Sequence, residues 1–366
     1  MPVKSEPSSE EGNYRELLDA SITGTLRQAL RIIAADPPLA FTGMQILSWQ
    51  KTAASRRRKK EREGLMVPPA LLLSMTSRCN LACRGCYMKT IRSGQAREMS
   101  PDRIRSIIAE ASDLGVSIVV LAGGEPLIRC AEISALARTH PRILFAVFSN
   151  GLLIDEAAAR GLAQTKNIVP ILSVEGFRDE TDNRRGAGVY EQILDACARL
   201  KHNGIFFGCS VTVTGNNCGL VTSERFVAEM HNAGARVFVF VEYVPVDPST
   251  EGLVLDGMQQ KALHEHIARL NQDHAALFIG FPGDEVSFGG CLAAGRGFVH
   301  VSPAGDLEAC PAAPFSDISL SENSLEDALR SPLLAAIRNN HHLLTETTGG
   351  CALWRKQEWV RDLLSR

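Results

Sequence analysis

The sequence predicts an α/β fold in which a partial, six-stranded (β/α) barrel is followed by a small C-terminal extension. The chain has 366 residues and is 45% hydrophobic, which is enough for a large buried core. From residue 70 onward, six short and almost continuously apolar runs alternate with segments of helical periodicity. Such runs are typical of parallel strands whose two faces are both covered by helices.

The first 67 residues are expected to form a helical and basic N-terminal extension. Residues 14–50 carry apolar side chains at helical spacing, and Pro37-Pro38 breaks that pattern. The basic run "RRRKKEREG" follows at residues 56–64. We interpret this run as a solvated helix face or a linker, and the alternative is a peripheral contact with an anionic membrane surface.

The barrel is expected over residues 68–270. Its strands are predicted at residues 70–76, 117–123, 143–150, 167–174, 205–213 and 236–243, with helices near residues 101–114, 131–139, 155–164, 190–203 and 222–233. Six units are fewer than the eight of a closed TIM barrel, so we expect a TIM-like barrel that stays partly open. Its active site should lie at the C-terminal ends of the strands.

Composition and charge narrow the class of protein. The net charge of −2 gives no global basic field, so no nucleic-acid partner is expected. The N-terminus is polar and acidic rather than a signal peptide, and no apolar stretch reaches the roughly 18 to 20 residues of a membrane span. We therefore expect a cytoplasmic protein whose ten cysteines stay reduced, and clustered cysteines then indicate a metal site or catalysis.

Three cysteines follow the first predicted strand at the catalytic end of the barrel. The segment "SRCNLACRGCYM" spaces Cys79, Cys83 and Cys86 as C-x3-C-x2-C. A structural zinc site normally has a fourth protein ligand, whereas an iron–sulfur cube held by three thiolates keeps one iron open for a substrate or cofactor. The spacing therefore favours an iron–sulfur cluster.

The stretch "CNLACRGCY" resembles the signature of the radical S-adenosylmethionine (radical SAM) superfamily, and the likeness extends over about residues 68–245. The resemblance implies a partial β/α barrel in which these three cysteines hold a catalytic [4Fe–4S] cluster. It also implies reductive cleavage of S-adenosylmethionine to a 5′-deoxyadenosyl radical that abstracts hydrogen from a substrate. The substrate and the reductant, such as a flavodoxin or ferredoxin, are not identified by the sequence.

Further motifs of the resemblance fall at the ends of the next predicted strands. "GGEP" at residues 123–126 resembles the loop that holds the methionine amino group, for which the carboxylate of Glu125 and the backbone around the glycines are suited. "SNG" at residues 149–151 and "SVEG" at residues 173–176 resemble the polar strand ends that meet the ribose and methionine portions. The resemblance thus assigns cofactor binding to Tyr87, Gly123, Gly124, Glu125, Ser149, Asn150, Ser173, Glu175 and Arg184. The adjacent Arg185 leaves the choice of arginine open by one position.

A second group of cysteines lies in the predicted extension, residues 271–366. Cys291, Cys310 and Cys351 follow turn-like segments, and "GFVHVSPAGDLEAC" predicts a hairpin that turns at Ala304-Gly305-Asp306. These features resemble the auxiliary-cluster extension called SPASM, or twitch when shortened, and imply a second [4Fe–4S] cluster. Either this cluster also keeps an open iron, or its fourth ligand is a histidine, Cys130, Cys209 or Cys218.

The resemblance does not identify the substrate, because related extensions occur in peptide maturases, sulfatase-maturing enzymes and haem-pathway enzymes. Peptide maturases often carry an N-terminal winged helix, and the helical N-terminus here weakens that interpretation. A basic, amphipathic N-terminus also suits a hydrophobic or membrane-associated substrate. A different class of protein is kept as the alternative, namely a non-catalytic iron–sulfur electron carrier or a zinc-binding scaffold, although neither would need Glu125 beside an open iron.

Overall fold

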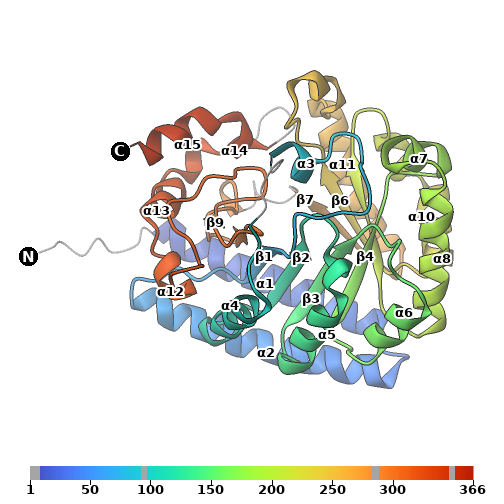
Figure 1. Cartoon of the computed structure of the whole chain (residues 1–366), viewed down its shortest axis with the longest axis horizontal. Coiled ribbons are helices and arrows are strands. Elements are labelled where there is room, and N and C mark those ends of the chain that lie inside the picture. Colours follow the sequence, from blue (N-terminus) through green and yellow to red (C-terminus); the bar gives the residue numbers. More distant parts are fainter. Residues whose placement is uncertain (1–8, 92–96, 282–287, 346–350, 366) are drawn as a thin grey trace, which may run out of the picture.

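The computed structural model describes residues 9–91, 97–281, 288–345 and 351–365. Its centre is one nine-stranded sheet in the order β7-β6-β5-β4-β3-β2-β1-β8-β9, with every neighbouring pair parallel except β8 and β9 (Figure 1). The strands are β1 (Ala70–Ser74), β2 (Ile118–Ala122), β3 (Leu144–Ser149), β4 (Ile168–Val174), β5 (Gly208–Val213), β6 (Val237–Glu242), β7 (Leu277–Phe281), β8 (Phe298–Val301) and β9 (Leu307–Glu308). β7 and β9 are its two edges, so the sheet is an open barrel, as the sequence predicts.

Helices follow the strands and cover the outer face of the sheet (Figure 1). All five predicted barrel helices are present, as α4 (Pro101–Leu114), α5 (Cys130–Thr139), α6 (Glu156–Ala163), α8 (Val189–His202) and α10 (Glu224–Ala233). α11 (Gly257–Asp273) adds a sixth. Ser100 and Ser223 cap the starts of α4 and α10 through their side chains, and Gly115 and Gly234 end the same helices in the left-handed conformation.

The two faces of the sheet bury different cores. Side chains of alternate strand positions, such as Leu71 and Leu73, pack outward against the helices. The inner face has a smaller core at the N-terminal ends of the strands, formed by Val169, Ile171, Val237, Val239 and Leu277. Ala29 and Ile32 of α1 (Ser9–Ile32) pack against this inner core. The N-terminal helix therefore closes one end of the barrel, and the opposite end carries the strand-end motifs.

The N-terminal region consists of α1 and α2 (Pro37–Arg62), which confirms the predicted break at Pro37-Pro38. The basic run lies at the end of α2, and some of its charged side chains form ion pairs and hydrogen bonds with other elements. Arg57 is buried, forms an ion pair with Asp19 and donates to the carbonyl of Gly115 at 2.5 Å. Lys60 pairs with Glu326 at 2.9 Å. These contacts support the interpretation of the run as a helix face, and its contact with a membrane remains a prediction.

The sheet extends beyond the six predicted strands on both sides. β7 pairs with β6 past residue 270, and β8 pairs in parallel with β1 from the far end of the chain. The sheet therefore continues past residue 270, and the division into a barrel and an extension remains a prediction. The predicted hairpin is confirmed by β8 and β9, and Gly305 takes the positive φ of 99° at its turn.

The C-terminal helices lie beside the hairpin (Figure 1). They are α12 (Leu325–Ala328), α13 (Pro332–Asn339), α14 (Ala352–Arg355) and α15 (Gln357–Leu364). No helix in the described ranges combines the length and apolar character that crossing a membrane requires.

Candidate active site

The loop that carries Cys79, Cys83 and Cys86 begins directly after β1, at the C-terminal end of the barrel strands. Cys79 is exposed and the other two thiols are half-buried. The loop ends at α3 (Tyr87–Ile91), so Tyr87 is the first residue of a short helix. Gly85 has a positive φ of 64°, and a Cβ there would lie 2.7 Å from the hydroxyl of Tyr243. A glycine is therefore required where the loop passes the end of β6.

The Gly123-Gly124 segment holds the cysteine loop through its backbone. The amide of Gly124 donates to the carbonyl of Thr76 at 2.7 Å, and that of Glu125 donates to the carbonyl of Arg78 at 2.8 Å. A Cβ on Gly124 would lie 2.0 Å from the Arg78 oxygen, and one on Gly123 would lie 2.5 Å from the Thr76 oxygen. Both glycines are thus needed for this close approach. These two amides bind the cysteine loop, which leaves carbonyl oxygens as the backbone groups suited to an ammonium.

Glu125 is buried, and both of its oxygens accept hydrogen bonds from the chain itself. Oε1 accepts from the amide of Leu127 at 3.0 Å and the hydroxyl of Ser149 at 2.8 Å, and Oε2 accepts from the amide of Asn150 at 2.8 Å. Burial raises the pKa of Glu125, while these hydrogen bonds oppose the rise. The carboxylate therefore joins the end of β2 to the end of β3, in addition to any contact with a ligand.

Asn150 links the end of β3 to the cysteine loop. Its side-chain amide donates to Oδ1 of Asn80 at 2.7 Å and lies 3.9 Å from the sulfur of Cys79. The backbone amide of Leu81 also donates to that sulfur, at 3.4 Å. Two N–H groups therefore point at Cys79, and such donors stabilise a thiolate that binds a metal.

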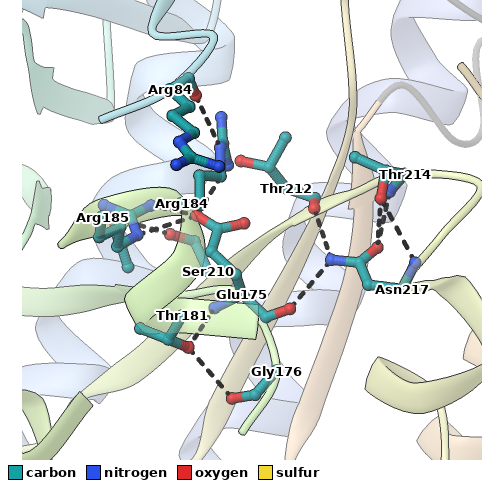
Figure 2. Close-up of polar contacts among 11 residues, drawn as sticks. Arg84, Glu175, Gly176, Thr181, Arg184, Arg185, Ser210, Thr212, Thr214 and Asn217 are labelled. Carbon is teal, nitrogen blue, oxygen red and sulfur yellow. Dashed lines mark hydrogen bonds and ion pairs between the residues drawn. The ribbon is translucent and has the colours of Figure 1, made fainter. Parts of the chain in front are cut away.

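Glu175, at the end of β4, lies between two arginines of α7 (Arg178–Arg185) (Figure 2). Its Oε1 accepts from Nε of Arg185 at 2.9 Å and forms an ion pair with Nη1 of Arg184 at 2.7 Å, a contact without hydrogen-bond geometry. Glu175 is only 2% exposed, and its Oε2 has no hydrogen-bond partner among the described residues. A buried carboxylate oxygen of this kind is costly unless a ligand binds it.

The cysteine loop is also attached to the end of α7. The backbone amide of Arg84 donates to the carbonyl of Arg184 at 2.9 Å, and Nε of Arg184 donates to the carbonyl of Arg84 at 3.2 Å (Figure 2). Arg185 instead directs its guanidinium to Glu175 through two nitrogens. Both arginines thus lie at the site. The sequence left open which of the two binds the cofactor, and the structure gives the two residues different contacts.

Several residues of this site were missed by the sequence analysis. The side chain of Asn217 donates to the carbonyls of Glu175 and Thr212 at 2.9 and 3.1 Å and so ties the end of β4 to the end of β5 (Figure 2). Thr181 accepts from the amide of Glu175 at 3.1 Å. Ser210 on β5 lies 3.4 Å from the hydroxyl of Ser173, the remaining predicted residue of β4. The "TGNN" turn after the fifth predicted strand was the available signal for Asn217.

The donor set of the cysteine loop fits an iron–sulfur cluster. Burial raises the pKa of the Cys79 and Cys83 thiols, and the positive charges of Arg185 and Arg184 oppose this for Cys83. In the described ranges no three ligand side chains are arranged tightly enough to hold a metal ion as they stand. The three thiols on one loop are nevertheless the type and number of donors that a cluster with one open iron takes.

The second cysteine group is assembled from three separate segments. Cys310 follows β9, and Cys351 caps the start of α14. A hydrogen bond with Cys351 and burial both raise the pKa of the Cys310 thiol well above its ordinary value, and the nearby Cys291 adds to this. The amide of Cys291 donates to the carbonyl of Leu344 at 3.3 Å. The structure therefore brings Cys291, Cys310 and Cys351 into one neighbourhood.

The cysteines considered as a fourth ligand lie in other elements. Cys130 begins α5, Cys218 begins α9 (Cys218–Val221), and Cys209 is a core residue of β5. The described residues thus give no support to these three as ligands.

Comparison with known proteins agrees with this geometry. The family model of the radical SAM superfamily matches residues 73–222. Mycofactocin maturase MftC of Mycobacterium ulcerans is 28% identical over 292 residues, which cover 75% of this chain and 77% of the relative. Fe-coproporphyrin III synthase of Methanosarcina barkeri is 28% identical over 152 residues, which cover 41% of this chain and only 38% of that relative.

A solved structure shows the same fold. SuiB of Streptococcus suis, bound to its precursor peptide SuiA, superposes with a TM-score of 0.64 at 20% identity, covering 80% of this chain and 71% of that chain. This likeness supports the open-barrel fold described above. Enzymes of this superfamily use S-adenosylmethionine and a [4Fe–4S] cluster, and relatives of the SPASM type carry auxiliary clusters. Residues 73–222 therefore form a radical SAM domain, and over most of its length the chain is similar to mycofactocin maturase MftC.

Proposed function

We propose that this protein cleaves S-adenosylmethionine reductively at a cluster held by Cys79, Cys83 and Cys86 and abstracts hydrogen from a substrate bound in the barrel. When bound, the reduced cluster supplies the electron that converts S-adenosylmethionine into methionine and a 5′-deoxyadenosyl radical. The chain itself binds and orients the cofactors and keeps water away from the radical.

One observation carries this proposal. The loop of Cys79 and the strand ends assigned to the cofactor form a single hydrogen-bonded network, because Asn150 contacts both Cys79 and Glu125. A non-catalytic electron carrier has no need of such strand ends around its cluster. The unpartnered Oε2 of Glu175 adds support, since a ribose hydroxyl is a donor of the required kind.

Individual residues then take separate tasks. The carbonyl oxygens around Gly123 and Gly124 accept from the methionine ammonium, and Glu125 holds that loop in position. Arg184 or Arg185 binds the methionine carboxylate, for which a guanidinium is well matched. Cys291, Cys310 and Cys351 hold a second cluster that exchanges an electron with the substrate or binds it.

The inner face of β7 supports a substrate with an apolar portion. Ile279 and Phe281 point to the same face as Leu277, and they are 38% and 37% exposed. Large apolar side chains left exposed inside a barrel mouth are typical of a binding surface. A peptide remains the second candidate because SuiB was solved with a precursor peptide, although the segment before β1 contains only helices in its described residues.

The test is anaerobic reconstitution followed by measurement of iron, sulfide and zinc and of 5′-deoxyadenosine after reduction. We expect two clusters per chain, no zinc and formation of 5′-deoxyadenosine. A tightly bound zinc without iron would instead favour the zinc-binding scaffold, and clusters without any cleavage of S-adenosylmethionine would favour the electron carrier.

A further inference from the structure

A buried chain of three polar side chains joins β1 to the β8–β9 hairpin. Oγ of Ser74 lies 2.8 Å from Nε2 of His300, and Nδ1 of the same ring lies 2.8 Å from Oε2 of Glu308. The three residues are 0%, 1% and 2% exposed. None of them belongs to the motifs of the active site, so their polarity needs another explanation.

The strand register places these side chains on one face of the sheet. His300 is directly opposite Glu308 in the antiparallel pair and opposite Leu72 in the parallel pair with β1. Ser74 follows Leu72 by two residues and therefore points to the same side. Their neighbours Leu73, Val301 and Leu307 point outward into the main core. The hydrogen-bonded series of Ser74, His300 and Glu308 therefore crosses the inner face of the barrel, near the C-terminal end of β1.

The chemistry of the three groups fixes which atom donates and which accepts in each of the two hydrogen bonds. A carboxylate only accepts hydrogen bonds, so Nδ1 carries the hydrogen shared with Glu308, and Nε2 of the neutral ring then accepts from the hydroxyl of Ser74. Such a buried network is stable only while all of its members are present, because loss of one leaves another buried and unsatisfied. Three apolar residues would fill the same space without that risk.

The sequence positions of Ser74 and Glu308, the two ends of the hydrogen-bonded series, indicate its role. Ser74 precedes Cys79 by five residues, and Glu308 precedes Cys310 by two. We propose that Ser74, His300 and Glu308 form a bridge that fixes Cys310, and with it the second cluster, relative to the loop that holds the first cluster. This proposal rests on the proposed function, because it requires two clusters.

The three are positioning residues, since they act through the cysteines and touch no reacting atom. A fixed separation matters because electron exchange between a substrate radical and the second cluster requires that both stay in one geometry. The hairpin is also attached by the ladder between β8 and β1 and by the amide of Met99, which donates to the carbonyl of Pro303 at 2.8 Å, but neither contact reaches β9. The bridge instead holds the strand pair that leads into Cys310.

The test uses the full chain, reconstituted anaerobically, with three variants. His300→Phe removes both hydrogen bonds and keeps a ring, Glu308→Gln keeps an acceptor for Nδ1, and Ser74→Ala removes one end. Glu242→Gln is the matched control, because Glu242 is equally buried but accepts from Gln260 of α11. The readouts are the electron paramagnetic resonance spectrum of the reduced protein and the rate at which a chelator removes iron.

We expect His300→Phe to lose iron of the second cluster about 10-fold faster than wild type and to alter only the signal that does not respond to S-adenosylmethionine. Ser74→Ala should do the same more weakly, and Glu308→Gln and the control should resemble wild type. If His300→Phe does not fold, the Ser74→Ala spectrum decides. Wild-type spectra and iron release in both variants would overturn the bridge alone, whereas a wild type with a single cluster would overturn the two-cluster function as well.

Discussion

The two cysteine groups differ in how the fold surrounds them. Cys79 lies exposed on a single loop that is held by backbone contacts to the ends of β2 and α7 and by the side chain of Asn150 at the end of β3. Cys310 is only 8% exposed, and its partners Cys291 and Cys351 come from two other segments that are distant in sequence. The first group is therefore open to a ligand from solvent at Cys79, while the second is centred on a buried thiol, with Cys291 and Cys351 half-buried beside it.

This contrast indicates a division of labour. An accessible cluster beside polar strand ends is suited to bind and cleave S-adenosylmethionine, whereas an enclosed one is suited to exchange electrons or to hold a substrate. The contrast also predicts that damage to the two groups will have different consequences for iron content and activity.

Replacing Cys79 with Ala should have the largest effect. A cluster that lacks one thiolate loses its hold on the open iron, so formation of 5′-deoxyadenosine should fall by more than about 100-fold. The second cluster should keep its iron. Cys130→Ala is the control, since that thiol belongs to neither group, and a Cys79→Ala protein of normal activity would remove the distinction between the groups.

Replacing Cys291, Cys310 and Cys351 together with Ala should abolish substrate turnover but leave cleavage of S-adenosylmethionine. About half of the iron should be lost, because only one cluster remains. Loss of a cluster can also unfold the loops around it, so circular dichroism must first show an intact barrel. A folded variant with wild-type iron content would mean that these cysteines are structural.

Gly124→Ala should damage the first group through sterics alone. The new Cβ would lie 2.0 Å from the Arg78 oxygen, so the cysteine loop must move, at a cost of about 1–3 kcal/mol in the free energy of unfolding. Iron content and activity should both fall. Gly161→Ala on α6 is the matched control, because nothing lies within 4 Å of its Cβ and the helix should gain up to about 1 kcal/mol. Equal stability and iron content of the two variants would contradict the close approach of Gly124 to the Arg78 oxygen.

Glu125→Gln should weaken the binding of S-adenosylmethionine by about 10-fold and leave the iron content unchanged. Gln offers only one acceptor oxygen, whereas Glu125 accepts through both, so one of the donors from β3 loses its partner. Equilibrium binding to the reconstituted protein measures this effect. A large loss of iron would show instead that Glu125 mainly supports the cysteine loop.

Asp182→Asn should have the smallest effect, and that effect should depend on pH. Hydrogen bonds from the amides of Tyr190 and Gly188 hold the pKa of Asp182 below its ordinary value of 3.8. A carboxyl with a lowered folded pKa stabilises the protein above its unfolded pKa and loses that contribution as the pH falls through the folded value. Denaturation of the cluster-free chain should therefore separate wild type from variant near pH 7 and bring them together near about pH 2. A constant difference would exclude this carboxyl as the cause.

Local patterns in the sequence predicted most of the fold. The six apolar runs, the helices between them and the break at Pro37-Pro38 depend on periodicity and on turn residues close by in the chain, and all are present. β7 was missed because it is a single run of five residues beyond the last predicted unit. The hairpin was predicted, but its pairing with β1 joins residues more than 200 positions apart, which no local pattern encodes.

The candidate site, like the fold, was only partly predictable from the sequence. The cysteine spacing and the residues at strand ends were visible, because parallel strands place their C-terminal ends at one edge. The hydrogen bonds that organise them were not visible, since Asn217 and Thr181 act through backbone groups of Glu175. Likewise, nothing in the local sequence of His300 indicates that it lies between Ser74 and Glu308.

The most direct test of the two-group account is electron paramagnetic resonance of the reduced, reconstituted protein with and without S-adenosylmethionine. We expect two cluster signals, of which only one changes when S-adenosylmethionine is added. That signal should be absent from Cys79→Ala and retained in the variant without Cys291, Cys310 and Cys351. A spectrum in which both signals change, or in which the responsive signal survives the loss of Cys79, would contradict it.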